Sequence, residues 1–300
     1  MLFGHEGYGV VAAVGPDTTG VREGDYVLVT WVPRRPATGR VAEVATLVLP
    51  NGVIARSPNV YTWSSYCLVD DLYVKPIGGG SHDPLMSIIG CAVITGAGAV
   101  MDAALTQKGE SVAIFGCGGV GLSAVVAAKV AGANRIVAVD HDDKKLDFAR
   151  HFGATDSVNS RTQDPVDSIM RLGPLRCACE PGVDVAIDCV AIPDVTTKAL
   201  DALRSGRLGA ERGGRCAVVG IPKQPVSVNT AEMMRKQKSL FGVLGGSAPQ
   251  ERIDEYINWY RDGILDLETL ITDRYQFEQI PVAANALERG LIKGRAIALV

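Results

Sequence analysis

The chain lacks both a long apolar run and a strong charge of either sign. The longest uncharged stretches, residues 84–101 and 111–128, only just reach the ~18 residues that a membrane-spanning helix needs, and we expect neither to span a membrane. The first residues, MLFGHEGYGVV, have no basic region and no apolar segment of the kind cleaved from secreted proteins. The formal net charge is only −3, so a surface for nucleic acid or anionic membranes has no electrostatic support. These absences predict a cytoplasmic protein without membrane or nucleic-acid partners.

Cysteine is also scarce, with seven residues scattered along the 300 of the chain. Because cytosolic redox conditions disfavour structural disulfides, we expect these side chains to be free thiols or metal ligands. Cys177 and Cys179 lie close together, with Cys189 nearby, but no second pair follows at the spacing of a zinc finger. Ordinary thiols are therefore the preferred interpretation of this group.

The order of the predicted elements divides the chain into two kinds of structure. Residues 1–78 are typical of a β-rich region, with short candidate strands at 8–14, 25–32, 44–49, 53–55 and 65–69. From about Ser87, apolar β-branched runs alternate with amphipathic helices, which indicates a buried parallel sheet. Its candidate strands are residues 111–115, 135–139, 183–189, 215–219 and 239–243. We therefore expect an α/β fold with a doubly wound parallel sheet and a second domain.

A glycine cluster follows the first candidate strand of the parallel sheet. Gly116 lets the chain turn off the strand, Gly118 lets backbone approach a pyrophosphate, and Gly121 lets the next helix pack closely. The start of that helix offers free N–H groups and the positive end of its dipole to phosphates. The dinucleotide-binding residues predicted in this cluster are Gly116, Gly118, Gly119, Val120 and Gly121.

The next strand ends in an acid, Asp140, about 20 residues after the cluster. A carboxylate at this spacing reaches the hydroxyls of the adenosine ribose and would repel the 2′-phosphate of NADP. No arginine follows it directly, and the next residue is His141. The sequence therefore predicts a Rossmann domain that binds NAD.

Two further motifs accompany this fingerprint. Gly4-His5-Glu6-Gly7-Tyr8-Gly9 is followed by a Gly24-Asp25 turn, and Gly90-Cys91 precedes the first nucleotide-binding strand. In this combination the chain resembles the zinc-dependent alcohol dehydrogenases of the medium-chain dehydrogenase/reductase superfamily. The resemblance implies a Rossmann domain at residues 91–245 and a discontinuous, β-rich, GroES-like catalytic domain at residues 1–90 and 246–300. It also implies an oxidoreductase that transfers hydride between an alcohol and its aldehyde or ketone, assembled as a dimer or tetramer.

The resemblance assigns the metal chemistry to three residues. His5 and Cys91 match catalytic zinc ligands, and Glu6 matches a glutamate that lies beneath the metal and binds it transiently. Imidazole and thiolate are ligands that Zn²⁺ prefers, and an open fourth position admits a substrate oxygen. Zinc would polarise a carbonyl, or lower the pKa of an alcohol, so that hydride can pass to or from the nicotinamide.

Further cofactor contacts are implied in the same way. Thr95 matches a position that contacts the nicotinamide ring, Lys145 matches a lysine on the adenosine ribose, and Arg295 matches a basic residue on the pyrophosphate. The backbone positions that would hold the carboxamide are Val219, Gly242 and Leu244.

The chain departs from this family in two regions. Family members carry a further segment before the GHE motif, and it holds the third zinc ligand, a cysteine, together with the Ser/Thr and His of a proton relay. The expected GroES-like domain is therefore N-terminally truncated, and an upstream start of the true gene product is preferred over a real fragment or a pseudoenzyme. Many relatives also place four cysteines after the second strand, whereas residues 33–66 contain none, so we expect one catalytic zinc and no structural zinc.

Two other functions compete with this interpretation. One is a zinc-free, NADPH-dependent enzyme similar to the quinone reductases of the same superfamily. His5, Glu6 and Cys91 together, and Asp140, count against it. The other is a truncated, non-catalytic remnant that only binds a dinucleotide.

Overall fold

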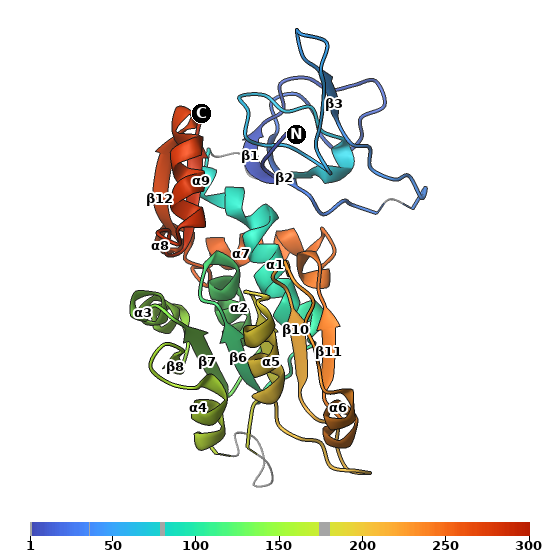
Figure 1. Ribbon diagram of the computed structural model, residues 1–300. Helices are drawn as coiled ribbons and strands as arrows, with labels where there is room; N and C mark the ends of the chain where they lie inside the picture. The colour runs from blue at the N-terminus through green and yellow to red at the C-terminus, as the bar shows by residue number, and fades with distance from the viewer. Residues whose placement is uncertain (1, 36, 79–81, 174–180) are drawn as a thin grey trace. The chain divides into compact units, whose positions relative to one another are not determined.

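The structure, a computed structural model, describes residues 2–35, 37–78, 82–173 and 181–300. The chain divides into two compact units (Figure 1). The terminal unit comprises Met1–Ile94 and Pro249–Val300, and the central unit comprises Thr95–Ala248. The domain boundaries expected from the sequence, after residues 90 and 245, lie close to these breaks.

The central unit is built on a six-stranded sheet of the order β11-β10-β9-β6-β7-β8. Every neighbouring pair is parallel. The strands are β6 (Ser111–Phe115), β7 (Arg135–Asp140), β8 (Asp156–Asn159), β9 (Val185–Asp188), β10 (Arg215–Val218) and β11 (Ser239–Gly242). The chain builds outward from β6 in one direction and then returns to build outward in the other, which makes the sheet doubly wound. The predicted fold class is confirmed.

Helices cover both faces of this sheet. On one face, α2 (Gly119–Val130) and α3 (Asp143–Phe152) contact each other and β7; on the other, α4 (Pro165–Arg171) and α5 (Pro193–Asp201) contact each other and the sheet. The central unit also contains α6 (Thr230–Lys236), a π-helical turn (Ala99–Ala103) and the short turn Gly245–Ser247. A first helix, α1 (Ala92–Gly98), spans the break between the units. Inner strands such as β6 are buried along their whole length, so apolar burial stabilises this unit.

The terminal unit contains three small sheets. The first is antiparallel, in the order β1 (Glu6–Val10), β2 (Tyr26–Thr30), β5 (Val74–Pro76). The second is the hairpin of β3 (Thr46–Val48) and β4 (Ile54–Arg56), and the third is a parallel pair, β12 (Ile271–Gln276) and β13 (Arg295–Leu299). The helices are α7 (Arg252–Arg261), α8 (Leu267–Leu270) and α9 (Ile280–Glu288), with short 3₁₀ segments at Asp71–Tyr73, Pro84–Gly90 and Phe277–Gln279.

The structure differs from the sequence-based expectations at a few elements. Residues 65–69 form no strand, and β5, eight or so residues later, is the third strand of the first sheet. Strands β8 and β12 were not expected. Strand β8 (DSVN) is the edge of the central sheet, so most of its side chains are only partly buried and its sequence is polar. It therefore lacks the continuous apolar run that marks an inner parallel strand.

Among the described residues, no single helix is long and apolar enough to cross a membrane. Only the segments Pro84–Gly90 and Ala92–Ala103 meet the length and composition requirement together, and a bend of 46° separates them.

Candidate active site

The terminal unit brings together two side chains that are 86 positions apart in the sequence. The Nε2 atom of His5 lies 3.1 Å from the Sγ atom of Cys91. A tetrahedral zinc ion with bonds of about 2.0 Å to nitrogen and 2.3 Å to sulfur would hold these atoms about 3.5 Å apart. The donor pair therefore has the chemistry and nearly the spacing of two zinc ligands.

Local packing explains why these two side chains meet. His5 follows Gly4, whose φ of +84° suits glycine and whose missing Cβ would lie only 2.6 Å from the backbone nitrogen of Trp63. Cys91 follows Gly90, where a Cβ would lie 2.8 Å from the carbonyl oxygen of Val29 in β2. β1 pairs with β2, and Gly90 packs against β2. His5, just before β1, and Cys91, just after Gly90, therefore lie close together.

Burial and a neighbouring positive charge both favour the neutral form of His5. Burial lowers the pKa of His5, and the positive charge of Arg295 lowers it further. A neutral imidazole presents a lone pair to a metal, whereas an imidazolium cannot.

Both carboxylate oxygens of Glu6 already have a partner within the protein. Its Oε2 accepts a hydrogen bond from the backbone N–H of Ala92 at 3.1 Å, and its Oε1 forms an ion pair with the Arg295 guanidinium. Burial lowers the pKa of Arg295 to about 10, yet a guanidinium remains charged at neutral pH. In the described part of the chain, no three His, Cys, Asp or Glu side chains are grouped so that they could hold a metal ion. The structure thus joins His5 with Cys91 and pairs Glu6 with Arg295.

Trp31 is a site residue that the sequence analysis missed. Its ring meets the His5 imidazole edge to face, with the centroids 6.4 Å apart. Its indole N–H is buried and has no hydrogen-bond partner among the described residues. The only sequence signal was an aromatic residue directly after an expected strand, which does not reveal that its ring borders His5.

The glycine cluster of the central unit has the geometry that its sequence predicts. Gly116 adopts a φ of +92° as the chain leaves β6, and a Cβ on Gly121 would lie only 1.9 Å from the carbonyl oxygen of Gly116. Gly118 is the N-cap of α2 and has no atom within 4 Å of the place of a Cβ. Gly119 and Val120 form the first turn of this helix. Its amides and the open space at Gly118 are suited to a pyrophosphate.

Asp140 is fixed at the carboxyl end of β7 by backbone hydrogen bonds. Its Oδ2 accepts from the N–H of Cys117 at 2.8 Å, and its Oδ1 accepts from the N–H groups of His141 and Asp142 at 2.7 and 3.1 Å. The carboxylate is thus tied to the glycine cluster and keeps lone pairs that ribose hydroxyls could use. Burial raises the pKa of the neighbouring Cys117 thiol well above its ordinary value, so that thiol stays protonated.

The other predicted cofactor residues are distributed over both units. In the central unit, Val219 and Gly242 lie at the carboxyl ends of β10 and β11, and Leu244 follows β11 with 76% of its surface exposed. Lys145 lies in α3, whereas Thr95 is buried with a hydroxyl that has no partner among the described residues. Arg295 belongs to the terminal unit, where it meets Glu6. The central-unit residues around the glycine cluster thus lie at the carboxyl ends of the parallel strands, where ligands bind in doubly wound folds.

Comparisons with known proteins agree with this arrangement. Residues 119–262 match the sequence profile of the family described as zinc-binding dehydrogenase. The chain is 29% identical to S-(hydroxymethyl)glutathione dehydrogenase of Saccharomyces cerevisiae, over 96% of this chain and 79% of that protein. It is also 29% identical to alcohol dehydrogenase class-2 isozyme 2 of Oryctolagus cuniculus, over 97% of this chain and 81% of that protein. The crystal structure of benzyl alcohol dehydrogenase from Acinetobacter calcoaceticus superposes with a TM-score of 0.82 at 29% identity, covering 99% of this chain and 83% of that one.

These matches support the zinc-dependent alcohol dehydrogenase family that the sequence resembles, and an oxidoreductase of the medium-chain superfamily. The individual ligands and cofactor contacts remain predictions, and Cys177 and Cys179 lie outside the described residues.

Proposed function

We propose that this alcohol dehydrogenase interconverts a small alcohol with its aldehyde or ketone by hydride transfer to and from NAD, with one catalytic zinc. The observation that carries this proposal is the approach of the His5 imidazole to the Cys91 thiol at 3.1 Å. An imidazole and a thiol that meet from separate elements are typical of a metal site, because both are ligands that zinc prefers. Apolar packing alone does not require the two groups to meet.

His5 and Cys91 would hold the zinc. When bound, zinc supplies a Lewis acid for the substrate oxygen, which favours hydride transfer at the adjoining carbon. Glu6 accepts a hydrogen bond from Ala92, the residue after Cys91, so it fixes the backbone that carries the thiolate. Arg295 forms an ion pair with Glu6 and neutralises its carboxylate, so the negative charge beside the proposed metal ligands is reduced. Glu6 and Arg295 are thus positioning residues.

Trp31 supplies an aromatic wall beside the proposed zinc ligands. Its ring borders His5 and also packs with Val29, Val60 and Tyr73. A large apolar ring would exclude water from the neighbourhood of the proposed ligands.

The glycine cluster and Asp140 account for the choice of cofactor. The amides at the start of α2 would bind the pyrophosphate, and the Asp140 carboxylate would accept hydrogen bonds from the adenosine ribose. The same negative charge would oppose the 2′-phosphate of NADP. We expect Asp140→Ser to lower kcat/KM with NAD about 10-fold and to narrow the preference over NADP, because charge-assisted hydrogen bonds are lost.

Three finer features belong to this proposal. We propose one zinc per chain and no structural zinc, because residues 33–66 contain no cysteine. Exposed apolar side chains such as Ile221 and Leu244 on the central unit, 84% and 76% exposed, support a homo-oligomer, dimer or tetramer. A cytoplasmic location is consistent with the sequence composition.

The deciding experiment is metal analysis of matched cysteine variants. We expect about one zinc per chain in the parent protein and in Cys67→Ser, and a loss of zinc in Cys91→Ser, with kcat/KM for alcohol oxidation reduced about 100-fold or more. Cys67 is exposed and has no place in the site, so it controls for the loss of a thiol. A metal-free parent that turns over with NADPH would support the quinone-reductase-like alternative. NAD binding without zinc and without alcohol oxidation would leave only a dinucleotide-binding remnant.

A further inference from the structure

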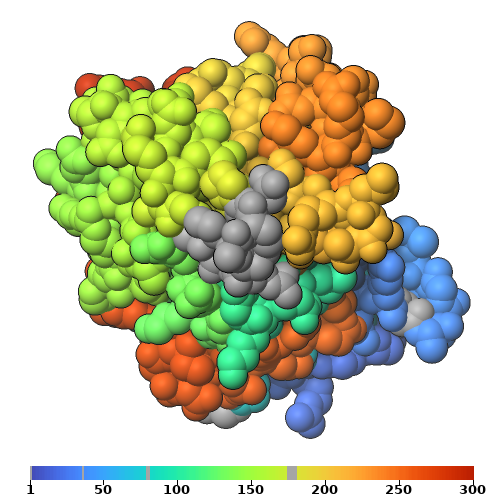
Figure 2. Space-filling view, turned by 90° about the horizontal axis from the view of Figure 1, so that it is seen from below, coloured from blue at the N-terminus to red at the C-terminus, as the bar shows by residue number. Residues whose placement is uncertain are grey.

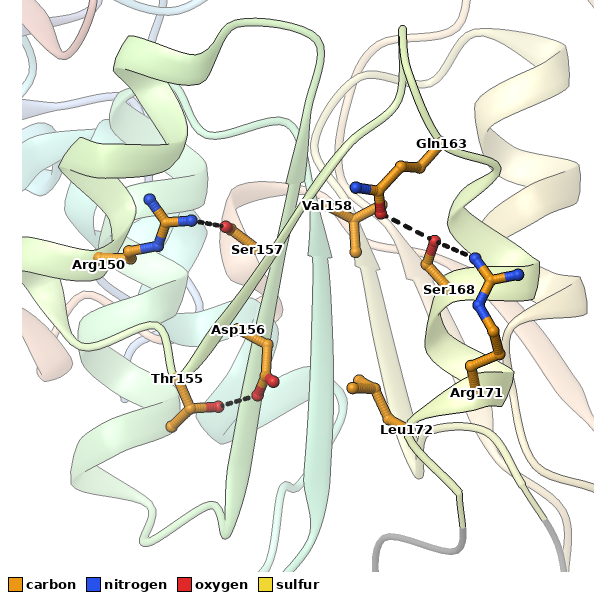
Figure 3. Close-up of a pocket in the computed structure, with 9 residues that line it drawn as sticks. All are labelled: Arg150, Thr155, Asp156, Ser157, Val158, Gln163, Ser168, Arg171 and Leu172. Atoms are coloured by element: carbon orange, nitrogen blue, oxygen red, sulfur yellow. Dashed lines mark hydrogen bonds between the residues drawn. The ribbon is translucent and has the colours of Figure 1, made fainter.

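The central unit has a second candidate site at the free edge of its sheet. A pocket of about 370 Å³ lies around β8, between α3 and α4 (Figure 3). Arg150 reaches it from α3, whereas Ser168 and Arg171 reach it from α4 (Figure 3). The other lining residues are Thr155, Asp156, Ser157, Val158, Gln163 and Leu172. In the space-filling view, the green to yellow-green surface of this region lies on the face that is shown (Figure 2).

Two guanidinium groups point to hydroxyls in this pocket. Arg150 Nη2 donates to Ser157 Oγ, and Arg171 Nη2 donates to Ser168 Oγ at 3.2 Å. Ser168 Oγ in turn donates to Gln163 Oε1 at 3.2 Å. Among the described residues, no carboxylate lies within ion-pair distance of Arg171, and the only one that pairs with Arg150 is the exposed Asp147. The pocket thus presents positive charge together with the Ser157 hydroxyl, which accepts from Arg150 and can donate to a ligand.

The one acid among the described lining residues is already neutralised. Asp156 Oδ2 accepts from Arg135 Nε at 2.8 Å and from the Thr155 hydroxyl at 2.7 Å. Arg135 balances Asp156, and Asp147 balances only one of the two pocket arginines, so the charges of the described residues sum to an excess positive charge.

The backbone of β8 adds further donors. Because β8 is the edge of the sheet, one side of it has no neighbouring strand. The N–H of Thr155 donates to Ile136 in β7 at 2.8 Å, so the N–H groups of the alternate residues Asp156 and Val158 face away from β7.

This pocket is separate from the cofactor site. None of the predicted NAD-binding residues lines it. Asp140 pairs with Asn159 at the carboxyl end of β8, whereas Thr155 and Asp156 lie at the other end of the strand, about 10 Å away at 3.3 Å per residue.

We propose that this pocket binds the phosphate monoester group of a small organic molecule. Arginine forks and hydroxyl donors match the oxygens of a phosphate dianion, which offers more acceptors than a single carboxylate. Val158 of β8 is buried, and Leu172, at the end of α4, is partly buried (Figure 3). Leu172 gives an apolar surface for the carbon body of the ligand, which inorganic phosphate would leave uncovered.

The test is calorimetric titration of the NAD-saturated protein with inorganic phosphate and with glycerol 3-phosphate. Saturating NAD blocks the pyrophosphate site, so the remaining phosphate binding reports on this pocket. We expect saturable binding of both probes, tighter for glycerol 3-phosphate, and about a 10-fold weakening of both in Arg171→Gln. Arg161→Gln removes an exposed arginine from the loop after β8 that does not line the pocket, and we expect less than a twofold change.

Several results would overturn the proposal. One is the absence of saturable phosphate binding in the parent protein, and another is equal weakening in Arg171→Gln and Arg161→Gln, which would indicate only a general charge effect. Ser168→Ala provides a second variant without a change of charge, and we expect a weakening of about threefold. The unfolding midpoint without phosphate shows whether each variant is folded. Cys91→Ser should bind phosphate like the parent, so this test is independent of the proposed zinc chemistry.

Discussion

The two units build their recognition chemistry from different materials. In the central unit the proposed cofactor site consists largely of backbone: amides at the start of α2 and glycines whose missing Cβ atoms leave room. In the terminal unit the proposed metal site consists of side chains from distant parts of the chain, His5, Cys91 and the Glu6–Arg295 pair. A backbone site is specified by a few adjacent residues, whereas a side-chain site depends on the packing of several elements.

The units also differ in how much apolar surface they bury. Strands β6, β7 and β9 of the central unit are nearly all buried. The hairpin of the terminal unit exposes most of its side chains, Val48 and Ile54 by 72% and 56%. Several of its contacts are surface ion pairs, since Arg40 binds Asp70 and Asp71, and Arg34 also binds Asp71. We therefore expect the terminal unit to be the less stable of the two.

The largest expected effect comes from breaking the ion pair of the terminal unit. Glu6→Gln leaves the Arg295 guanidinium without its charged partner, and we expect a loss of about 3 kcal/mol in the free energy of unfolding. Zinc content should fall as well, because Glu6 also holds the amide after Cys91. Chemical denaturation followed by tryptophan fluorescence measures the first effect, since Trp31 lies beside His5. Unchanged stability and zinc content would show that the pair is not a support of the site.

The central unit also has a buried ion pair, between Asp184 and Arg204, whose contribution to stability depends on pH. Asp184 is fully buried and bonds to Ser111 and to Arg204 Nε, the latter at 2.6 Å. Burial alone would raise the pKa of Asp184, but the hydrogen bonds from Ser111 and Arg204 outweigh it, so the pKa is lowered below 3.8.

This contribution to stability is therefore present above pH 3.8 and is lost as the pH falls through the folded-state pKa. Thermal unfolding of the parent protein should show that loss in acid. In Asp184→Asn we expect about 2–3 kcal/mol lower stability at neutral pH and a flatter acid limb, because the titrating carboxylate is absent. An acid limb as steep as that of the parent would assign the pH dependence to other groups.

A pair of glycine variants tests whether the cofactor site is made of backbone. In Gly121→Ala the new Cβ would lie 1.9 Å from the Gly116 carbonyl oxygen, so we expect a loss of about 2–3 kcal/mol of stability and weak NAD binding. Gly118→Ala meets no atom within 4 Å, so stability should change by less than about 0.5 kcal/mol.

NAD binding should nevertheless weaken in Gly118→Ala, because the Cβ would occupy the approach to the pyrophosphate. Denaturation, and titration with NADH followed by the fluorescence of its reduced nicotinamide, separate the two effects. Tight NAD binding in Gly118→Ala would place the pyrophosphate elsewhere.

The smallest effect is expected at the hairpin turn of the terminal unit. Gly52 adopts a φ of +76° and has open space around the place of a Cβ, so Gly52→Ala meets only backbone strain, about 1 kcal/mol. Asn51→Ala in the same turn removes only the bond from the Val53 N–H to its Oδ1 and serves as the milder comparison. Proteolysis of the hairpin at rising temperature measures both. A larger effect than that of Gly121→Ala would contradict the proposed order of stability.

Much of the fold could be predicted because the signals were local. The strand at residues 111–115, the glycine cluster and Asp140 form one continuous pattern, in which the Asp140 carboxylate binds the amide of Cys117 only 23 positions earlier. The missed strands were polar edges or short pieces. Strand β8 needs only its one pairing with β7, and its sequence DSVN reflects solvent on the other side.

The sequence by itself determined the nucleotide-binding fold and the family of this protein, because both rest on turns and strands whose physical requirements are met by neighbouring residues. Tertiary structure decided that the His5 ring lies against Cys91, that Arg295 occupies Glu6, that Trp31 borders His5, and that two arginines share a pocket at the edge of β8. These contacts join residues from separate elements, so they depend on how strands and helices pack. Periodicity and spacing along the chain do not encode the distance between two such side chains, because packing alone sets that distance.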